Sequence, residues 1–203
     1  MNSTIKYYDD NAKAYYENTI DADVSELYEP FLEHLEPGAK ILDAGCGSGR
    51  DSLFFKQGGF SVTAFDGSKE MVRAASERIE QDVLCMSFED LKLPEQYDGI
   101  WACSSLLHVN RNDLVSVLKG LSDSLKQTGV FYMSFKYGTK EYRAGGRYFN
   151  CLTEESFRAV ISEIPNLRIA SLLVTGDVRP GRERELWLNS YLLKESSCTN
   201  PVR

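Results

Sequence analysis

The feature that most constrains this chain is a glycine-rich turn that directly follows a short apolar strand. Residues 41–50 read Ile-Leu-Asp-Ala-Gly-Cys-Gly-Ser-Gly-Arg, and residues 50–57 have the pattern of a helix that ends at Gly58 and Gly59. Glycines let the backbone turn tightly and approach a ligand closely. The helix points its free N–H groups at the same place. The pattern therefore predicts a nucleotide-like ligand at the carboxyl edge of a sheet.

The same alternation of strand and helix continues along the chain. After a first strand at 40–43, we expect strands at 60–65, 83–86, 97–103, 129–137, 167–175 and 185–193. We expect helices at 7–18, 24–35, 50–57, 68–79, 112–126 and 153–163. Helices between strands imply a mostly parallel sheet, and the last two strands, with no helix between them, imply an antiparallel hairpin at its end. The fold class is α/β, a Rossmann-like sheet flanked by helices.

Length and composition fit one domain of 203 residues with one core. We expect residues 1–36 to form a helical lid segment, residues 37–194 the main domain, and residues 195–203 a flexible tail, because the tail lacks apolar periodicity. No run approaches 18 apolar residues, and the first eight residues are polar, so no membrane span or signal peptide is expected. The five scattered cysteines include no Cys-x-x-Cys pair, which fits a reducing cytoplasm and no metal site.

The charge balance limits the partners. With 30 acidic and 23 basic residues, the net charge is -7, and such a surface repels nucleic acid and anionic membranes. This favours a small-molecule partner. A local basic patch would still permit a nucleic-acid substrate, so that alternative stays open. The sequence leaves the oligomeric state open as well.

The residues around the glycines discriminate between ligands. A phosphate-binding loop needs Lys-Ser or Lys-Thr after its last glycine, and a dinucleotide fingerprint needs glycine at position 50, but Arg50 and Asp51 stand there. Asp43 would be unfavourable beside a pyrophosphate, yet it suits the ammonium and sulfonium of S-adenosylmethionine (SAM). Asp66 ends the next strand, where a carboxylate accepts hydrogen bonds from two ribose hydroxyls. Together the motif at 43–49 and Asp66 predict SAM.

This combination resembles the class I SAM-dependent methyltransferases over residues 7–194. It is most similar to the small bacterial methyltransferases of the tellurite-resistance type, which share the Gly-Arg-Asp/Asn-Ser run seen at 49–52. The resemblance implies a seven-stranded sheet and in-line transfer of the SAM methyl group, with S-adenosylhomocysteine as product. Members of the family methylate oxygen, nitrogen, sulfur or chalcogen atoms, and the sequence does not choose among them.

The resemblance also assigns residues to the cofactor. The glycine loop would line the methionine moiety, Asp66 the ribose and Met71 the adenine, while Cys103 would offer its backbone carbonyl to the SAM amino group. Many relatives have Asp-Ala where this chain has Ser87-Phe88, so Glu89 is an alternative partner for the adenine amino group. The full predicted cofactor set is Asp43, Ala44, Gly45, Cys46, Gly47, Gly49, Arg50, Asp66, Gly67, Met71, Ser87, Phe88, Glu89, Cys103, Tyr15 and Tyr16.

Three further features permit two interpretations each. The N-terminal tyrosines, including Tyr15 and Tyr16, either cover the ligand or simply dock their helix. His108 follows a strand end, where it is either a general base or a packing residue.

The basic segments 136–147 and 177–184 are either solvated loops or a pocket for an anionic acceptor, with Lys136, Arg147 and Arg179 as the binding residues.

The predicted function is a SAM-dependent methyltransferase that acts on a small molecule. Two other functions remain open. One is methylation of tRNA or protein through the arginine-rich segments, which a steep salt dependence of binding would reveal for a nucleic acid. The other is a non-catalytic SAM-binding module, which would bind SAM without turnover.

Overall fold

The computed structural model describes residues 2–94 and 96–195. The prediction of a flexible tail at 195–203 concerns, apart from Glu195, residues that lie outside this described part. Within the described part, no helix combines the length and apolar character needed to cross a bilayer.

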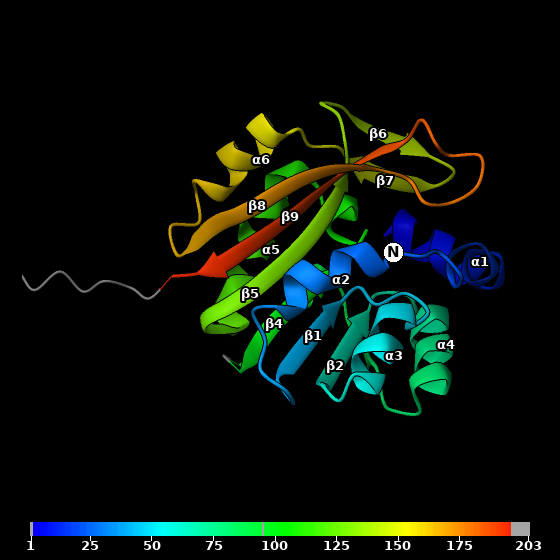
Figure 1. The fold of residues 1–203 in the computed structure, drawn as a ribbon. Helices are drawn as coiled ribbons and strands as arrows, with labels where there is room; N and C mark the ends of the chain where they lie inside the picture. The colour runs from blue at the N-terminus through cyan, green and yellow to red at the C-terminus, as the bar shows by residue number, and fades with distance from the viewer. Residues whose placement is uncertain (1, 95, 196–203) are drawn as a thin grey trace, which may run out of the picture.

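A seven-stranded sheet forms the centre of the molecule (Figure 1). Its strands are β1 (Lys40–Ala44), β2 (Ser61–Asp66), β3 (Leu84–Cys85), β4 (Tyr97–Ala102), β5 (Leu125–Lys136), β8 (Leu167–Gly176) and β9 (Leu186–Lys194). The order is β3-β2-β1-β4-β5-β9-β8, and β9 runs antiparallel to both of its neighbours. The predicted fold class, a mostly parallel sheet that ends in an antiparallel strand pair, is confirmed.

Helices cover both faces of the sheet. They are α1 (Ser3–Thr19), α2 (Ser25–Leu32), α3 (Arg50–Gln57), α4 (Lys69–Ile79), α5 (Arg111–Ser124) and α6 (Glu154–Ile161). The apolar sides of α5 and α6 pack with Leu42 and Phe131 on one face, whereas α2 and α3 pack with Ile41 and Trp101 on the other. Adjacent strand residues thus serve opposite faces, as the pleat requires.

The order of the strands places a crevice at the carboxyl end of β1. The chain passes from β1 to β2 on one side, and from β4 to β5 on the other side. The loops that follow the neighbouring strands β1 and β4 therefore run apart. Open α/β sheets bind ligands at such a switch point. Figure 1 shows α1 beyond this edge, where it contacts both α4 and β7.

A small hairpin, which was not predicted, lies in and just after the basic segment 136–147. Strands β6 (Glu141–Ala144) and β7 (Arg147–Asn150) pair antiparallel around Gly145 and Gly146, both with positive φ. Every side chain of β6 is exposed, so the sequence lacks the apolar alternation of a half-buried strand. The Gly-Gly pair, a typical two-residue hairpin turn, was the available indication.

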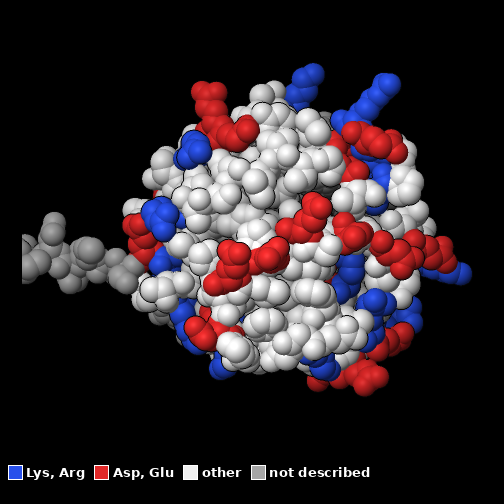
Figure 2. Space-filling view, viewed as in Figure 1, with Lys and Arg blue, Asp and Glu red and all other residues white. Residues whose placement is uncertain are grey.

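Charges are mixed over the surface. On the face shown in Figure 2, acidic and basic side chains are interspersed, and no broad basic area appears. This arrangement agrees with the acidic overall balance of the chain.

We predict opposite stability effects for alanine at two glycines. Gly49 has a φ of 79°, and a Cβ there would lie 3.2 Å from the Ala75 Cα, so Gly49→Ala should destabilise the protein by about 1–2 kcal/mol or more. Gly120 lies exposed within α5 with open space around its Cα, so Gly120→Ala should stabilise by about 0.5–1 kcal/mol. Urea unfolding of both variants measures the two changes, and a shift of the same sign in both would contradict the assignment.

Candidate active site

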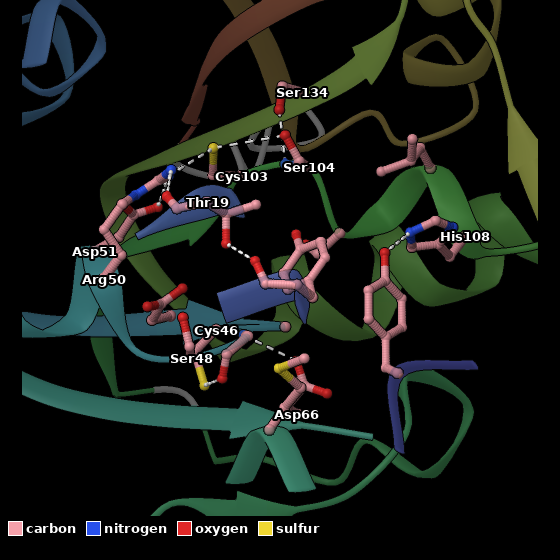
Figure 3. Close-up of a pocket in the computed structure, with 18 of the residues that line it drawn as sticks. Thr19, Cys46, Ser48, Arg50, Asp51, Asp66, Cys103, Ser104, His108 and Ser134 are labelled. Atoms are coloured by element: carbon pink, nitrogen blue, oxygen red, sulfur yellow. Dashed lines mark hydrogen bonds and ion pairs between the residues drawn. The ribbon is translucent and has the colours of Figure 1, made fainter. Parts of the chain in front are cut away.

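A large cavity lies over the carboxyl edge of the sheet. The loops after β1, β2, β3 and β4 and the last part of β5 form its floor, and α1, β7 and the β8–β9 connection line its sides. Figure 3 shows Arg50 and Asp51 at one side of the cavity and His108 at the opposite side.

Most of the predicted site residues line this one cavity. From the predicted cofactor set these are Asp43, Gly45, Cys46, Gly47, Arg50, Asp66, Gly67, Met71, Ser87, Phe88, Glu89, Cys103 and Tyr15. The predicted acceptor-side residues His108, Lys136, Arg147 and Arg179 line it too. Segments that are far apart in the sequence therefore contribute to one enclosed space.

Three predicted residues do not line the cavity. Ala44 is fully buried in the sheet core, because it alternates with Asp43 along β1. Gly49 begins α3 and packs against Ala75 on α4. Tyr16 points to α4, where its hydroxyl accepts a hydrogen bond from Arg78 at 3.0 Å, because adjacent helix residues point about 100° apart.

Tyr8 is one of the N-terminal tyrosines that were expected either to cover the ligand or to dock their helix, but it is not in the predicted cofactor set. It lies on α1 seven residues before Tyr15, so the two rings share a helix face and meet edge to face at 5.0 Å. Both line the cavity. The spacing of seven, rather than the mere presence of aromatic residues, was the indication in the sequence.

The glycine loop is shaped for a ligand. The N–H groups of Gly45 and Cys46 both donate to the Phe65 carbonyl at 2.9 Å, which ties the loop to β2. Gly45 has a φ of 77°, and a Cβ there would lie only 2.5 Å from the Ser105 Cβ. Glycine is therefore required at this position for both conformation and space.

Asp66 ends β2 and faces the glycine loop. Its carboxylate accepts hydrogen bonds from the N–H groups of Gly47 and Ser68, each at 2.9 Å. Burial raises the pKa of Asp66, and these two hydrogen bonds oppose the rise. A carboxylate held in this way keeps lone pairs available for hydroxyl groups of a ligand.

A second buried carboxylate, Asp51, organises the start of α3. It accepts hydrogen bonds from Arg50 at 2.6 Å, Tyr28 at 2.7 Å and Trp101 at 2.8 Å. Burial acts to raise its pKa, but Arg50 and the other donors bring the pKa below its ordinary value. Asp51 is therefore ionised and paired.

Asp43 lacks such a cationic partner. It accepts a hydrogen bond from the Ser52 hydroxyl at 2.6 Å, and its carboxyl group is almost fully buried. Burial and the nearby charge of Asp51 raise the pKa of Asp43 to about 8. A cationic group of a ligand would favour the ionised form of this carboxyl.

His108 stands between two hydrogen-bond partners at the other end of the cavity. Its Nδ1 lies 2.6 Å from the backbone carbonyl of Tyr148, which can only accept, so Nδ1 carries the proton. Its Nε2, 2.8 Å from the Tyr8 hydroxyl, is then the acceptor. Burial lowers the pKa of His108 to about 4, helped by the charges of Arg147 and Lys136 and opposed by the Tyr148 hydrogen bond. The histidine is neutral at pH 7.

Two of the three predicted acceptor-side cations are already paired. Lys136 forms an ion pair with Glu185. Arg179 donates to Asp177 at 2.8 Å, and Asp177 also accepts from Trp187. Burial acts to raise the pKa of Asp177, but its bonds to Arg179 and Trp187 lower it to about 2. Arg147 instead lies against aromatic rings, 4.3 Å from the centroid of Tyr7.

Comparison with known proteins agrees with this architecture. Residues 41–129 match the family model described as a methyltransferase domain. Among solved structures, a Burkholderia thailandensis 1,6-didemethyltoxoflavin-N1-methyltransferase superposes with a TM-score of 0.74 at 19% identity, covering 95% of this chain and 85% of that one. A SAM-dependent methyltransferase from Methanosarcina mazei gives 0.73 at 18% identity, covering 83% and 98%. The chain shares its fold with these methyltransferases, and the resemblance to SAM-dependent methyltransferases inferred from the sequence is confirmed.

Curated relatives match over shorter segments. The ubiquinone biosynthesis O-methyltransferase of Xanthomonas campestris pv. campestris is 31% identical over 48% of this chain and 43% of its own length. A probable S-adenosyl-L-methionine-dependent methyltransferase, TehB, of Haemophilus influenzae is 29% identical over 41% of this chain and 31% of its own length. The chain thus spans less than half the length of these two relatives.

The buried, neutral His108 predicts a specific loss of stability in acid. Its pKa is about 4 in the folded protein and 6.5 for the ordinary group, so the unfolded chain takes up the proton first as the pH falls below 6.5. Between pH 7 and pH 5 this should cost the folded state about 2 kcal/mol. His108→Gln should lose this part of the pH dependence, whatever it does to stability at pH 7.

Urea unfolding at pH 7 and pH 5 measures the effect. His34 is the other histidine of the chain and is exposed, so His34→Gln should keep the wild-type difference between the two pH values. Equal pH dependence in wild type and His108→Gln would show that His108 is not buried in its neutral form.

Proposed function

We propose that this chain is a methyltransferase that takes the methyl group from SAM and transfers it to a small-molecule acceptor. The observation that carries the proposal is the division of one cavity into two chemically different ends. The glycine loop, Asp43, Asp66 and Arg50 lie at one end, and His108 lies at the other with Lys136 and Arg147, all three around Phe149 (Figure 3). Such a cavity suits the meeting of a donor and an acceptor.

The residues at the donor end fit SAM. Asp43 is a buried carboxyl whose pKa is raised by burial and by the charge of Asp51, and the ammonium group of SAM would favour its ionised form. Asp66 would accept hydrogen bonds from the ribose hydroxyls. Met71, Phe88 and Glu89 line the part of the cavity assigned to the adenine. SAM would supply a methyl group activated by its sulfonium, which is already a good leaving group.

The protein would contribute alignment and the exclusion of water. Holding two reactants in line supplies up to about 7–11 kcal/mol of a barrier. We propose that α1 acts as a lid together with the β6–β7 hairpin, because Tyr8 and Tyr15 of α1 line the cavity. Several hydrogen bonds hold α1 in place; among them, the Ser68 hydroxyl donates to Asp9 at 2.7 Å, and the Tyr148 N–H donates to Thr4 at 3.0 Å.

A small acceptor is favoured over a macromolecule. Two similar proteins are named for such acceptors: an O-methyltransferase of ubiquinone biosynthesis and an N1-methyltransferase of 1,6-didemethyltoxoflavin. The cavity is closed by α1 and β7, and the face in Figure 2 lacks a broad basic area for a nucleic acid.

We predict that the protein binds SAM and S-adenosylhomocysteine but not NAD, and that Asp66→Asn weakens SAM binding at least tenfold. The substitution removes the charge that would accept from the ribose, and a hydrogen bond to a charged group contributes about 1.5–3 kcal/mol. Calorimetry with the three ligands measures both effects. Asp123→Asn, an exposed substitution on α5, should leave SAM binding unchanged. NAD binding without SAM binding would reject the proposed cofactor.

A screen for S-adenosylhomocysteine formation tests catalysis. The protein is incubated with SAM and, in turn, small phenols, amines, thiols, oxyanions and total tRNA, and we expect turnover with a small acceptor. Turnover with tRNA alone would support the nucleic-acid function instead. SAM binding without turnover on any acceptor would support a non-catalytic module.

A further inference from the structure

Arg147 differs from the other basic side chains that line the cavity. Among the described residues that line the cavity, five side chains are basic: Arg50, Lys136, Arg147, Arg179 and Arg182. Four of them form ion pairs, with Asp51, Glu185, Asp177 and Glu185 respectively. Arg147 forms no ion pair within the described chain, and its Nε has no hydrogen-bond partner there. Lys136 and Arg182 share the single carboxylate of Glu185. Arg147 is therefore the basic lining side chain, among those described, that has no carboxylate partner.

The rings around Arg147 orient its guanidinium group. The Cζ lies 4.3 Å from the ring centroid of Tyr7, 5.1 Å from that of Phe149 and 6.0 Å from that of Tyr8. A guanidinium that packs against ring faces keeps its N–H groups in its own plane, where they can bind a carboxylate or phenolate. The same rings offer flat apolar surface beside the charge, which suits a planar ligand.

The acceptor end offers no effective base among its described side chains. The Nε2 of His108 already accepts from Tyr8, and its Nδ1 donates to a carbonyl. The Asp177 carboxylate is engaged by Arg179 and Trp187. The lowered pKa values of His108 and Asp177 make both groups weak bases. The site is therefore poorly suited to an acceptor that must lose a proton during the reaction.

We propose that the methyl acceptor is a planar aromatic anion, a phenolate or an aromatic carboxylate, with Arg147 as its counter-ion. This proposal rests on the proposed methyltransferase function and narrows its substrate class. The anionic oxygen forms a bond to the methyl carbon while the bond from that carbon to sulfur breaks, and the electron pair stays on sulfur. A sulfonium and an anion give a neutral thioether and a neutral ether or ester, so no proton has to be moved.

The test uses protein saturated with S-adenosylhomocysteine and two probes of the same shape, 4-nitrobenzoate and 4-nitrobenzamide. Because Arg147 has no carboxylate partner among the described residues, wild-type protein should bind the benzoate at least tenfold more tightly than the neutral amide. Arg147→Met, which removes the charge and keeps an unbranched stem, should abolish this preference. Its affinity for S-adenosylhomocysteine should not change. Calorimetry measures all of these affinities.

Arg143→Met is the matched control. Arg143 lies on the same hairpin and also packs on an aromatic ring, with its Cζ 5.6 Å from the centroid of Tyr148, but it does not line the cavity. This variant should keep the preference for the anion. The proposal is overturned if the amide binds as tightly as the benzoate, if the preference survives in Arg147→Met, or if the benzoate does not bind at all. Failure of S-adenosylhomocysteine to bind would instead reject the donor site, which is a separate result.

Discussion

The buried carboxylate of Asp51 is the interaction on which the rest of the cavity depends. It joins three elements, because its donors are Tyr28 on α2, Arg50 on α3 and Trp101 on β4. An ionised group inside a protein is tolerated only when it is paired and hydrogen-bonded, so these elements are held in one arrangement. That arrangement fixes the start of α3 beneath the glycine loop. It also pairs Arg50 with Asp51, and the charge of Asp51 together with burial raises the pKa of Asp43.

The two ends of the cavity therefore differ in the ligand charge that they would favour. Asp43 lies beside the glycine loop, where a cation would favour its ionised form, and Arg147 lies at the other end without a carboxylate partner among the described residues. The remaining basic lining residues pair with carboxylates of the protein itself, although Lys136 and Arg182 share Glu185. A cavity polarised in this way favours one orientation of two oppositely charged ligands over the reverse, because the reverse would place like charges together.

The helices and strands were predicted well from the sequence where burial controls the pattern of apolar residues. The helix at 50–57 was predicted with the bounds that the structure has, since a glycine turn precedes it and Gly58 follows it. The antiparallel final pair followed from the absence of a helix between two strands. The hairpin at 141–150 was missed because β6 is exposed and has no apolar side to reveal it. Asp51 was considered only as a departure from a phosphate-binding loop, and its partners Tyr28 and Trp101 lie 23 and 50 residues away. Contacts of that kind depend on the tertiary fold.

The contact between Thr4 and Tyr148 has a consequence for how this protein is made. The two residues are 144 positions apart, although their hydrogen bond links α1 to the hairpin beside the cavity. During synthesis, the N-terminal helix leaves the ribosome first. Its partner Tyr148 is made only after most of the chain has been synthesised. Because joining distant segments has an entropic cost, the contact belongs late on the folding path. The cavity is thus bordered by the segment of the chain that is synthesised first and by segments that are synthesised late.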